Sequence, residues 1–356
     1  MKVLMEESLA VILEKPEQLA IKRIPIPPVS KPSVRVAMRA CGICGSDVRY
    51  YYGENPWGLH TLGKNVPSPP NMVLGHEVAG VMQTDAGERR VAILAYKACG
   101  ECEHCRAGRE NICDNMEHFG HSAGWSSMPY YPGGMSEQFD IWDGFAYTIP
   151  DAVSFEAATF LDGLAVAIHA VEQGNLQAGG QFGVLGLGPI GMLAAQVARV
   201  KGASRVVGCD VSAFPVDLAS KVGLTEMIQA DSSGFKKYIR DTQSRGLDVI
   251  IDTVGTPESI QDGLSILNKA GAFVLLAVHE DPLALPSVLL SGERSLLTSS
   301  NSRYRHFPEA IDLLAEGKIQ VEPLITHRFH LPDALEAFAV MREKEQHQAY
   351  KMVIVP

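Results

Sequence analysis

Four cysteines in the first third of the chain follow one another at short spacing. Cys99, Cys102, Cys105 and Cys113 have two, two and seven residues between them. Four thiolates spaced in this way can close a loop around one zinc ion in tetrahedral coordination, with no coordination position left open. We therefore expect a structural zinc lobe. An iron–sulfur cluster is the alternative, although its usual spacings differ, and a thioredoxin-like pair is disfavoured because no βαβ pattern surrounds the cysteines.

A second set of metal-ligand types comes from two separate segments. Cys44 lies between glycines in residues 42–45, and His76 stands between Gly75 and Glu77. A cysteine and a histidine from different loops would supply two of the three protein ligands that a catalytic zinc needs. Each residue alone is weak evidence, because a cysteine in an apolar stretch is more often part of core packing.

A third segment is rich in glycine and follows a short apolar run at 181–185. Apolar residues at helical spacing come next, at 190–200, so the segment is predicted to be a βα turn. In a dinucleotide-binding turn, Gly186 would permit the tight bend, Gly188 the approach of a pyrophosphate, and Gly191 close packing of the helix. The residues expected to contact a nucleotide here are Gly186, Gly188, Pro189, Ile190 and Gly191.

The next predicted strand, 204–209, is followed directly by Asp210, which lies 19 residues after Gly191. A carboxylate in this place would accept hydrogen bonds from the adenosine ribose and repel a 2′-phosphate. No lysine or arginine follows before Lys221, so we expect NAD rather than NADP. The plainer alternative is that Asp210 only caps a helix that begins near Ser212, or closes a turn.

Strand and helix patterns alternate after the glycine turn, which predicts a parallel, doubly wound α/β sheet. Residues 9–38 contain instead short alternating runs split by prolines, which predict small antiparallel strands. The chain of 356 residues is long enough for two cores. The further elements expected are strands at 247–253, 271–278, 325–329 and 351–355, and helices at 257–267 and 303–317.

These patterns predict two domains. The last two strands are expected to return to the first domain, so a mostly β catalytic domain would comprise residues 1–155 and 300–356. Residues 156–299 would form the nucleotide-binding domain.

Composition narrows the class of protein. Hydrophobic residues make up 46% and charged residues 20%, which is a globular balance, and no apolar run approaches the roughly 20 residues needed to span a bilayer. Glu6 and Glu7 interrupt a possible signal peptide, and seven cysteines are an odd count for a secreted disulfide framework. We therefore expect a cytoplasmic protein. The net charge of −10 disfavours nucleic-acid and anionic-membrane partners.

Taken together, the motifs resemble the zinc-containing medium-chain alcohol dehydrogenases, and in detail the sorbitol, threonine and sugar dehydrogenase branch. The resemblance covers essentially the whole chain. It implies a GroES-like catalytic domain with a structural zinc lobe, a Rossmann domain that binds NAD, one catalytic and one structural Zn²⁺, and a homodimer or homotetramer. The matching segments occur in the family's order at 42–47, 75–77, 99–113, 133–134 and 186–191.

The resemblance also implies roles for single residues. Cys44 and His76 would hold the catalytic zinc, with Glu77 as a nearby or alternative ligand. Ser46 would begin the proton relay, and Asp47 would support the ligands. The nucleotide contacts implied beyond the turn and Asp210 are Val254, Ala277 and Val278.

One expected ligand departs from the family's pattern. Members of this branch usually carry Glu-Pro before the helix that starts at Leu164, whereas this chain has Asp162-Gly163. Aspartate can ligate zinc but is one methylene shorter, so we expect direct or water-mediated ligation by Asp162, with helix capping as the alternative. Arg49 stands where polyol-specific relatives often have histidine, which leaves the relay beyond Ser46 open.

The reaction that the resemblance implies is transfer of hydride between NAD and a secondary alcohol of a small molecule, a polyol or a sugar. Two alternatives remain on the sequence. One is a zinc-independent reductase of the same fold, in which Cys44 and His76 would be idle. The other is an NAD-binding, redox-sensing module without turnover.

Overall fold

A computed structural model describes residues 6–26, 28–29, 32–63, 66–120, 130, 132–242, 245–277 and 282–356. The chain divides into two compact units. Unit 1 comprises Met1–Asp162 and Leu324–Pro356, and unit 2 comprises Gly163–Pro323.

Unit 2 is built on a sheet of six parallel strands in the order β13-β12-β11-β14-β15-β16. The first strand of this unit, β11, lies in the middle of the sheet. The next two strands lie on one side of it and the last three on the other, so the strand order reverses beside β11. Ligands of such sheets bind at the carboxyl ends of the strands where the order reverses. The predicted doubly wound sheet is therefore confirmed. Its strands are β11 (Gln181–Leu185), β12 (Arg205–Asp210), β13 (Glu226–Gln229), β14 (Leu247–Asp252), β15 (Leu267–Leu275) and β16 (Ser295–Thr298).

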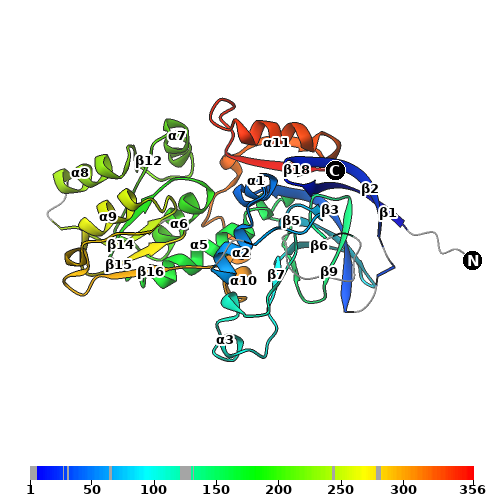
Figure 1. Cartoon of the computed structure of the whole chain (residues 1–356), viewed down its shortest axis with the longest axis horizontal. Helices are drawn as coiled ribbons and strands as arrows, with labels where there is room; N and C mark the ends of the chain where they lie inside the picture. Colours follow the sequence, from blue (N-terminus) through cyan, green and yellow to red (C-terminus); the bar gives the residue numbers. More distant parts are fainter. Residues whose placement is uncertain are drawn as a thin grey trace, which may run out of the picture. The chain divides into compact units, whose positions relative to one another are not determined.

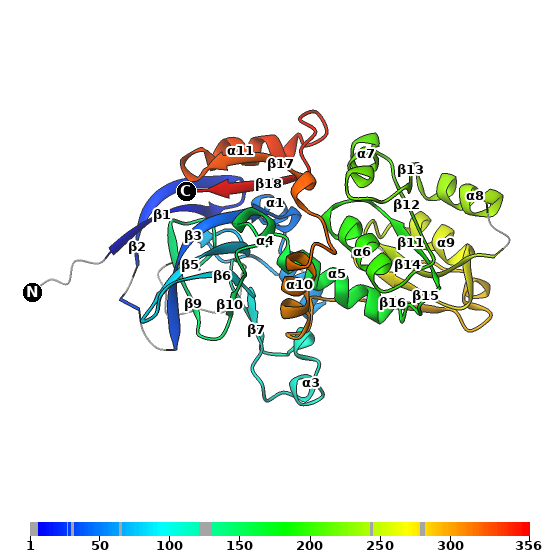
Figure 2. The same cartoon turned by 180° about the vertical axis from the view of Figure 1, so that it is seen from behind.

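Helices alternate with these strands, as Figures 1 and 2 show for the green and yellow part of the chain. Helix α6 packs against β11, β12 and β14, whereas α8 packs against β12 and α9. The buried aromatic rings of Phe235 and Phe273 belong to the core of this unit. The helices are α5 (Leu161–Gln173), α6 (Pro189–Val200), α7 (Ala213–Lys221), α8 (Ser232–Thr242), α9 (Pro257–Ser265) and α10 (His306–Ala315), with a short 3-10 helix η2 (Ser287–Leu290).

One predicted boundary in this unit is wrong. The helix expected at 257–267 ends at Ser265, and the strand expected to begin at residue 271 begins at Leu267. Leu267 pairs in the parallel ladder with Leu247, and the register then shifts before Ala272 pairs with Val249. Pairing with β14 therefore outweighs the helical spacing of the apolar residues in this segment.

Unit 1 contains the antiparallel strands. Its largest sheet has the order β10-β6-β5-β3-β18-β17, with β9 also paired to β3. The C-terminal strand β18 (Lys351–Val355) lies antiparallel beside β3 (Ser33–Ile43), seen in Figure 1 as a red strand among blue ones. The predicted return of the last two strands to the first part of the chain is thus confirmed. The other strands are β1 (Glu6–Lys15), β2 (Gln18–Ile26), β4 (Met72–Val73), β5 (Glu77–Thr84), β6 (Gly87–Ile93), β7 (Tyr96–Lys97), β8 (Glu117–His118), β9 (Gln138–Trp142), β10 (Ala146–Thr148) and β17 (Ile325–His330).

Short helices close the ends of these strands. Between β7 and β8 the chain leaves the sheets and forms the loop that carries α3, which extends away from the strands of unit 1 in Figures 1 and 2. The helices are α1 (Gly45–Tyr51), α2 (Pro56–Leu62), α3 (Glu103–Arg106), α4 (Phe155–Ala158) and α11 (Ala334–Arg342), with 3-10 turns η1 (Glu110–Ile112), η3 (Glu322–Leu324) and η4 (Leu331–Asp333).

The two compact units divide after Asp162 and after Pro323, whereas the sequence patterns placed the domain boundaries after residues 155 and 299. Helix α4 packs against β3 and β5 and so belongs with the strands of unit 1. Helix α10 belongs to unit 2, where His306 Nε2 lies 2.7 Å from Glu172 Oε2 on α5. None of the helices in the described part of the chain is both long and apolar enough to traverse a bilayer.

Candidate metal centres and nucleotide-binding turn

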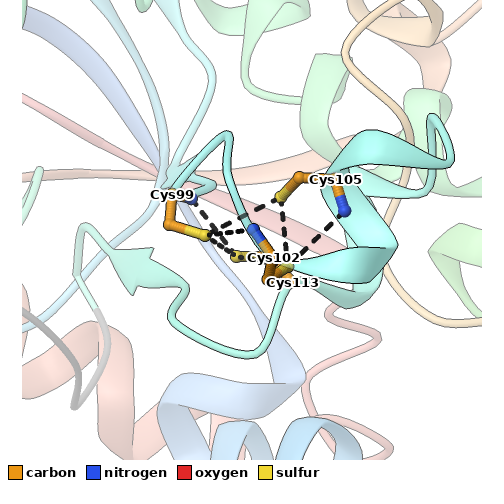
Figure 3. Close-up of side chains that lie close together, drawn as sticks. All are labelled: Cys99, Cys102, Cys105 and Cys113. Carbon is orange, nitrogen blue, oxygen red and sulfur yellow. Dashed lines mark hydrogen bonds between the residues drawn. The ribbon is translucent and has the colours of Figure 1, made fainter.

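The four cysteines of the predicted lobe converge on one point, as Figure 3 shows. The Sγ–Sγ distances are 3.4 Å for Cys99–Cys113, 3.5 Å for Cys102–Cys105, 3.9 Å for Cys102–Cys113 and 4.0 Å for Cys99–Cys105. A tetrahedron with Zn–S bonds of ~2.3 Å has edges of about 3.8 Å. None of the four cysteines forms a disulfide. The sulfurs are therefore spaced as a single zinc ion requires.

The protonation of these thiols also favours a cation. Hydrogen bonds from the backbone N–H groups of Glu101 and Cys102 lower the pKa of Cys99 to about 6. Burial and a hydrogen bond with Cys102 raise the pKa of Cys105 to about 12. The protein alone therefore cannot keep all four sulfurs as thiolates near neutral pH, whereas a divalent ion at their centre would.

A second group of donors lies in unit 1. Donor atoms of Cys44, His76 and Glu77 all lie within 4.8 Å of one another. Cys44 directly precedes α1, and His76 and Glu77 stand where the chain enters β5. His76 and Glu77 are buried, at 4% and 7% exposure. The structure thus brings together two of the predicted ligands and the residue expected to lie beside them.

Asp47 ties the two segments of this group together. Its Oδ2 accepts a hydrogen bond from the Cys44 N–H at 2.9 Å, and its Oδ1 accepts one from the Gly75 N–H at 3.3 Å. The same Oδ1 lies 3.9 Å from His76 Nδ1. Asp47 is fully buried, and burial raises its pKa to about 6. A single carboxyl group therefore sets the relative position of the loops that carry Cys44 and His76.

The electrostatics of the group fit a positive ion. Burial by itself lowers the pKa of His76, but a hydrogen bond with Cys44 and the negative charges of Cys44, Asp47 and Asp162 raise it to about 10. The site thus attracts positive charge even onto a buried imidazole. One thiolate, one imidazole and one carboxylate are a donor set that zinc accepts, so the residues present fit a zinc ion.

Asp162 lies outside the group of three donors. It is half-buried at the start of α5, and burial raises its pKa while the charge of His76 lowers it. Its carboxylate therefore interacts electrostatically with His76. Its oxygens do not belong to the group of Cys44, His76 and Glu77 donor atoms that lie within 4.8 Å of one another.

Ser46 lies two residues after Cys44, in the first turn of α1. Its Oγ is buried and has no hydrogen-bond partner among the described residues. A buried hydroxyl group without a partner is uncommon. A bound molecule could supply that partner.

Two further side chains near this group lie outside the predicted set of ligands. Lys351, the first residue of β18, is 2% exposed and forms an ion pair with Glu77. His118, which feels the charge of His76, is also buried, and burial lowers its pKa to about 3. The only sequence signal for Lys351 is a charged residue at the head of the apolar run 351–355, which is weak.

The glycine turn follows β11 as predicted. Gly186 has φ of +87°, and a Cβ on it would lie 2.4 Å from Thr253 Oγ1. A Cβ on Gly191 would lie 2.0 Å from the Gly186 carbonyl oxygen, so a side chain there would push α6 away from the turn. Gly188 precedes Pro189, the first residue of α6, which Ile190 follows. No atom of the described residues lies within 4 Å of the Gly188 Cβ position. The backbone at Gly188 is open to a ligand.

Asp210 ends β12 and contacts this turn directly. Its Oδ2 accepts a hydrogen bond from the Leu187 N–H at 2.8 Å, and its Oδ1 accepts one from the Ser212 N–H at 2.9 Å. Ser212 is the residue before α7. The carboxylate therefore makes the contact with Ser212 that the plainer alternative predicts, and it also binds the glycine turn through Leu187 N.

The other expected nucleotide contacts follow the next two strands. Val254, after β14, is 41% exposed. Ala277, after β15, lies against Gly255, whose Cβ would be 2.6 Å from the Ala277 carbonyl oxygen. Val278 lies outside the described residues.

A third group of donors, which was not predicted, lies in unit 2. Donor atoms of His169, Glu172 and His306 lie within 4.8 Å of one another. However, His306 Nδ1 accepts a hydrogen bond from the Arg303 N–H at 3.0 Å, so the proton of the neutral ring sits on Nε2. That Nε2 faces Glu172 Oε2 at 2.7 Å. A protonated ring nitrogen cannot bind a metal, so this group is a hydrogen-bonded network.

Two family models match the chain and together cover most of it. The alcohol dehydrogenase GroES-like domain matches residues 30–151, and the zinc-binding dehydrogenase model matches residues 189–316. The first match includes both cysteine-bearing groups of unit 1, and the second includes Asp210.

Curated relatives align along nearly the whole chain. Sorbitol dehydrogenase of Bacillus subtilis is 28% identical over 341 residues, which is 92% of either chain. Probable D-xylulose reductase A of Aspergillus clavatus is 29% identical over 348 residues, 93% of either chain.

Solved structures with the same fold include three from bacteria. L-idonate 5-dehydrogenase of Escherichia coli has a TM-score of 0.86 at 26% identity and covers 99% of each chain. An alcohol dehydrogenase of Escherichia coli with NADH bound has a TM-score of 0.86 at 26% identity, covering 98% of this chain and 99% of that one. A zinc-binding dehydrogenase of Sinorhizobium meliloti with NADP bound has a TM-score of 0.86 at 27% identity, covering 99% and 100%. The chain belongs to the zinc-containing medium-chain alcohol dehydrogenases, in the branch that includes sorbitol dehydrogenase.

Proposed function

We propose that this protein catalyses the reversible oxidation of a secondary alcohol group of a polyol or sugar to a ketone, with NAD as the hydride acceptor. The proposal rests on the donor atoms of Cys44, His76 and Glu77, which lie within 4.8 Å of one another. Ser46 Oγ, two residues from Cys44, has no hydrogen-bond partner among the residues that the structure describes. The names of the sorbitol, D-xylulose and L-idonate enzymes support the substrate class.

Cys44, His76 and Glu77 would hold the catalytic zinc, and Cys99, Cys102, Cys105 and Cys113 the structural zinc. A zinc ion in the first site supplies a Lewis acid that lowers the pKa of a bound hydroxyl group, and NAD supplies the hydride acceptor. Asp162, which lies outside the group of three, would ligate this zinc directly or through a water molecule.

The residues of the chain then orient the substrate and move its proton. Ser46 Oγ would accept a hydrogen bond from the substrate hydroxyl and so make the first contact of a proton relay. Asp47 would keep Cys44 and His76 in register. Because Asp47, His76 and Glu77 are all less than a tenth exposed, water would be kept from the ligands and the electrostatic interactions would stay strong.

In the nucleotide-binding unit, the open backbone at Gly188 and the start of α6 would face the pyrophosphate. Asp210 would accept hydrogen bonds from the ribose hydroxyls while it holds Leu187 N. Val254, Ala277 and Val278 would complete the contacts. One related structure binds NADH and another NADP, and we favour NAD because a carboxylate at Asp210 repels a 2′-phosphate.

The test combines metal analysis with turnover. Wild-type protein, purified without chelator, is expected to contain two zinc ions per chain and to reduce NAD in the presence of sorbitol, xylitol, L-idonate or 2,3-butanediol. Ser46→Ala is expected to lower kcat by about 10²-fold or more, as the loss of a proton-transfer group does, without loss of zinc.

Two outcomes would overturn the proposal. Turnover that survives complete removal of the second zinc would favour the zinc-independent reductase. Nucleotide binding with two zinc ions but no turnover on any alcohol would favour the redox-sensing module.

The finer points of assembly and location are part of the same proposal. We expect a homodimer or homotetramer, which light scattering after size-exclusion chromatography would measure. A cytoplasmic location is supported by seven cysteines without a disulfide, since reduced thiols of this kind persist in a reducing compartment.

A further inference from the structure

One ion pair of unit 1 is buried, whereas most ion pairs of the described residues are exposed. The side chains of Lys351 and Glu77 are 2% and 8% exposed, whereas those of the Lys22–Glu14 pair are 51% and 36% exposed. Removing two charges from water is costly, so a buried pair often adds little net stability. The burial of this pair therefore points to a role of Lys351 other than stability.

The pair reaches across a strand. Glu77 begins β5 and Lys351 begins β18, on opposite sides of β3 in the same sheet. Gly42 of β3 is paired with both Glu77 and Val353. Paired residues share a face of a sheet, and so do residues two apart on one strand. Lys351 therefore lies on the same face as Gly42 and Glu77.

Gly42 provides the space that the pair needs. A Cβ at this position would lie 2.6 Å from Lys351 Nζ and 2.8 Å from Glu77 Oε2. Glycine is therefore required at residue 42 by the side chains that cross over it. Any side chain there would push the two charged groups from their positions.

Lys351 touches a second part of the site. Its Nζ lies 5.0 Å from the ring centroid of Phe160, within the range of a cation–π contact. Phe160 stands two residues before Asp162. One ammonium group is thus in contact both with Glu77 and with the segment that leads to Asp162.

We propose that Lys351 is a positioning residue, which holds Glu77 by Oε2 and thereby presents the other carboxylate oxygen to the catalytic metal. The inference rests on the proposed function, because it assigns Glu77 to the metal site. Within the described residues, the Glu77 carboxylate has no hydrogen-bonding partner but Lys351. Without that bond the side chain would be free to rotate, and Cys44, Asp47 and Asp162 would repel its charge.

The affinity of the second zinc tests this inference. Competition with a chelator would be measured for wild type, Lys351→Met and Lys351→Arg, and Cys44→Ser would show which of the two zinc ions belongs to this site. Groups that orient a ligand typically change metal affinity by about 10- to 100-fold. We expect a loss of that size for Lys351→Met and a smaller loss for Lys351→Arg.

A matched control and an independent variant keep the test specific. Lys22→Met removes the lysine of an exposed pair in the same unit and should leave zinc affinity unchanged. Gly42→Ala keeps both charges but moves them apart, and should weaken the second zinc as well. If Lys351→Met fails to fold, Gly42→Ala and Lys351→Arg still decide the question.

The route of the effect can be tested by a double-mutant cycle. If Lys351 acts through Glu77, Lys351→Met should have little further effect on zinc affinity in a Glu77→Gln background. The absorption spectrum of the cobalt-substituted protein should also change in Lys351→Met, because the ligand geometry changes.

The outcomes separate the inference from the proposed function. A wild type whose second zinc is absent, or is indifferent to Cys44→Ser, would refute the proposed function. A second zinc that depends on Cys44 but keeps its affinity and cobalt spectrum in Lys351→Met would overturn only the inference. Lower thermal stability with unchanged affinity would likewise show that Lys351 is merely structural.

Discussion

The two proposed zinc sites of unit 1 are built in opposite ways. The lobe takes all its ligands from residues 99–113, and backbone N–H groups of the same loop point at the sulfurs, as Cys102 N does at Cys99 Sγ. The other proposed site combines donors from Cys44, just before α1, and from His76 and Glu77, where the chain enters β5, with Lys351 from a segment close to the C-terminus. A local loop can bind its ion by itself, whereas an assembled site depends on the whole sheet that holds it.

The largest effect should come from breaking the assembled site. His76→Ala removes the imidazole and leaves Asp47 and Cys44 without the group between them. We expect turnover to fall by at least about 10³-fold, equivalent to about 4 kcal/mol of transition-state stabilisation. NADH affinity, followed by fluorescence titration, should change little, because the nucleotide turn belongs to unit 2.

The matched control is Cys41→Ala. Cys41 is fully buried, and burial raises its pKa well above the usual range of a thiol, so it would remain neutral. This variant should keep both zinc ions and most of its turnover. Retained activity in His76→Ala would contradict the assignment of the catalytic site.

The lobe should respond to mutation in its stability. Cys102→Ser leaves three sulfurs and one weak ligand, so we expect one zinc per chain to be lost and the free energy of unfolding to fall by about 3 kcal/mol. Turnover per folded molecule should remain within a few-fold of wild type. Zinc analysis beside denaturant unfolding would measure both, and an unchanged unfolding midpoint would show that the lobe contributes no stability.

The same contrast explains what the sequence could predict. The spacing from Cys99 to Cys113 and the glycines of the βα turn are local patterns, and each determines its own geometry. Lys351 and Glu77 are 274 residues apart, and only the order β5-β3-β18 brings them together. Sequence spacing carries no information about that order.

Two other sequence expectations also concern contacts between distant segments, which sequence spacing does not determine. Asp162 was expected to ligate the metal directly or through a water molecule; it lies outside the group of three donors, and its ligation stays a prediction. The start of β15 at Leu267 depends on pairing with β14. In both cases a contact between distant segments decides the outcome.

Asp210 offers a local test in unit 2. Asp210→Asn removes the charge but can keep an acceptor for Leu187 N. We expect the ratio of kcat/KM for NAD over NADP to fall by about 10- to 100-fold, since the repulsion of a 2′-phosphate is lost. Asp217→Asn, an exposed acid on α7, is the control. An unchanged ratio in Asp210→Asn would leave Asp210 as a residue that only holds the turn.

The smallest effect is expected at the third donor group, and it tests whether proximity of donors is enough to make a metal site. Glu172→Gln should leave the zinc content unchanged, because His306 carries its proton on the nitrogen that faces Glu172. A loss of one zinc would show that this group binds metal after all.

The same variant should change how stability depends on pH. Burial raises the pKa of Glu172, but hydrogen bonds and charge from Arg305 and His306 outweigh it and lower the pKa from 4.5 to about 2. A carboxylate whose pKa is lower in the folded state stabilises that state fully above pH 4.5, and this contribution declines as the pH falls towards 2.

Because the Glu172 side chain is 45% exposed, we expect its charge to add at most about 1 kcal/mol to the free energy of unfolding. Denaturant unfolding at pH 6 should therefore separate wild type from Glu172→Gln, and the difference should shrink as the pH falls from 4.5 to 3. A constant difference over this range would mean that Glu172 contributes through packing and not through its charge.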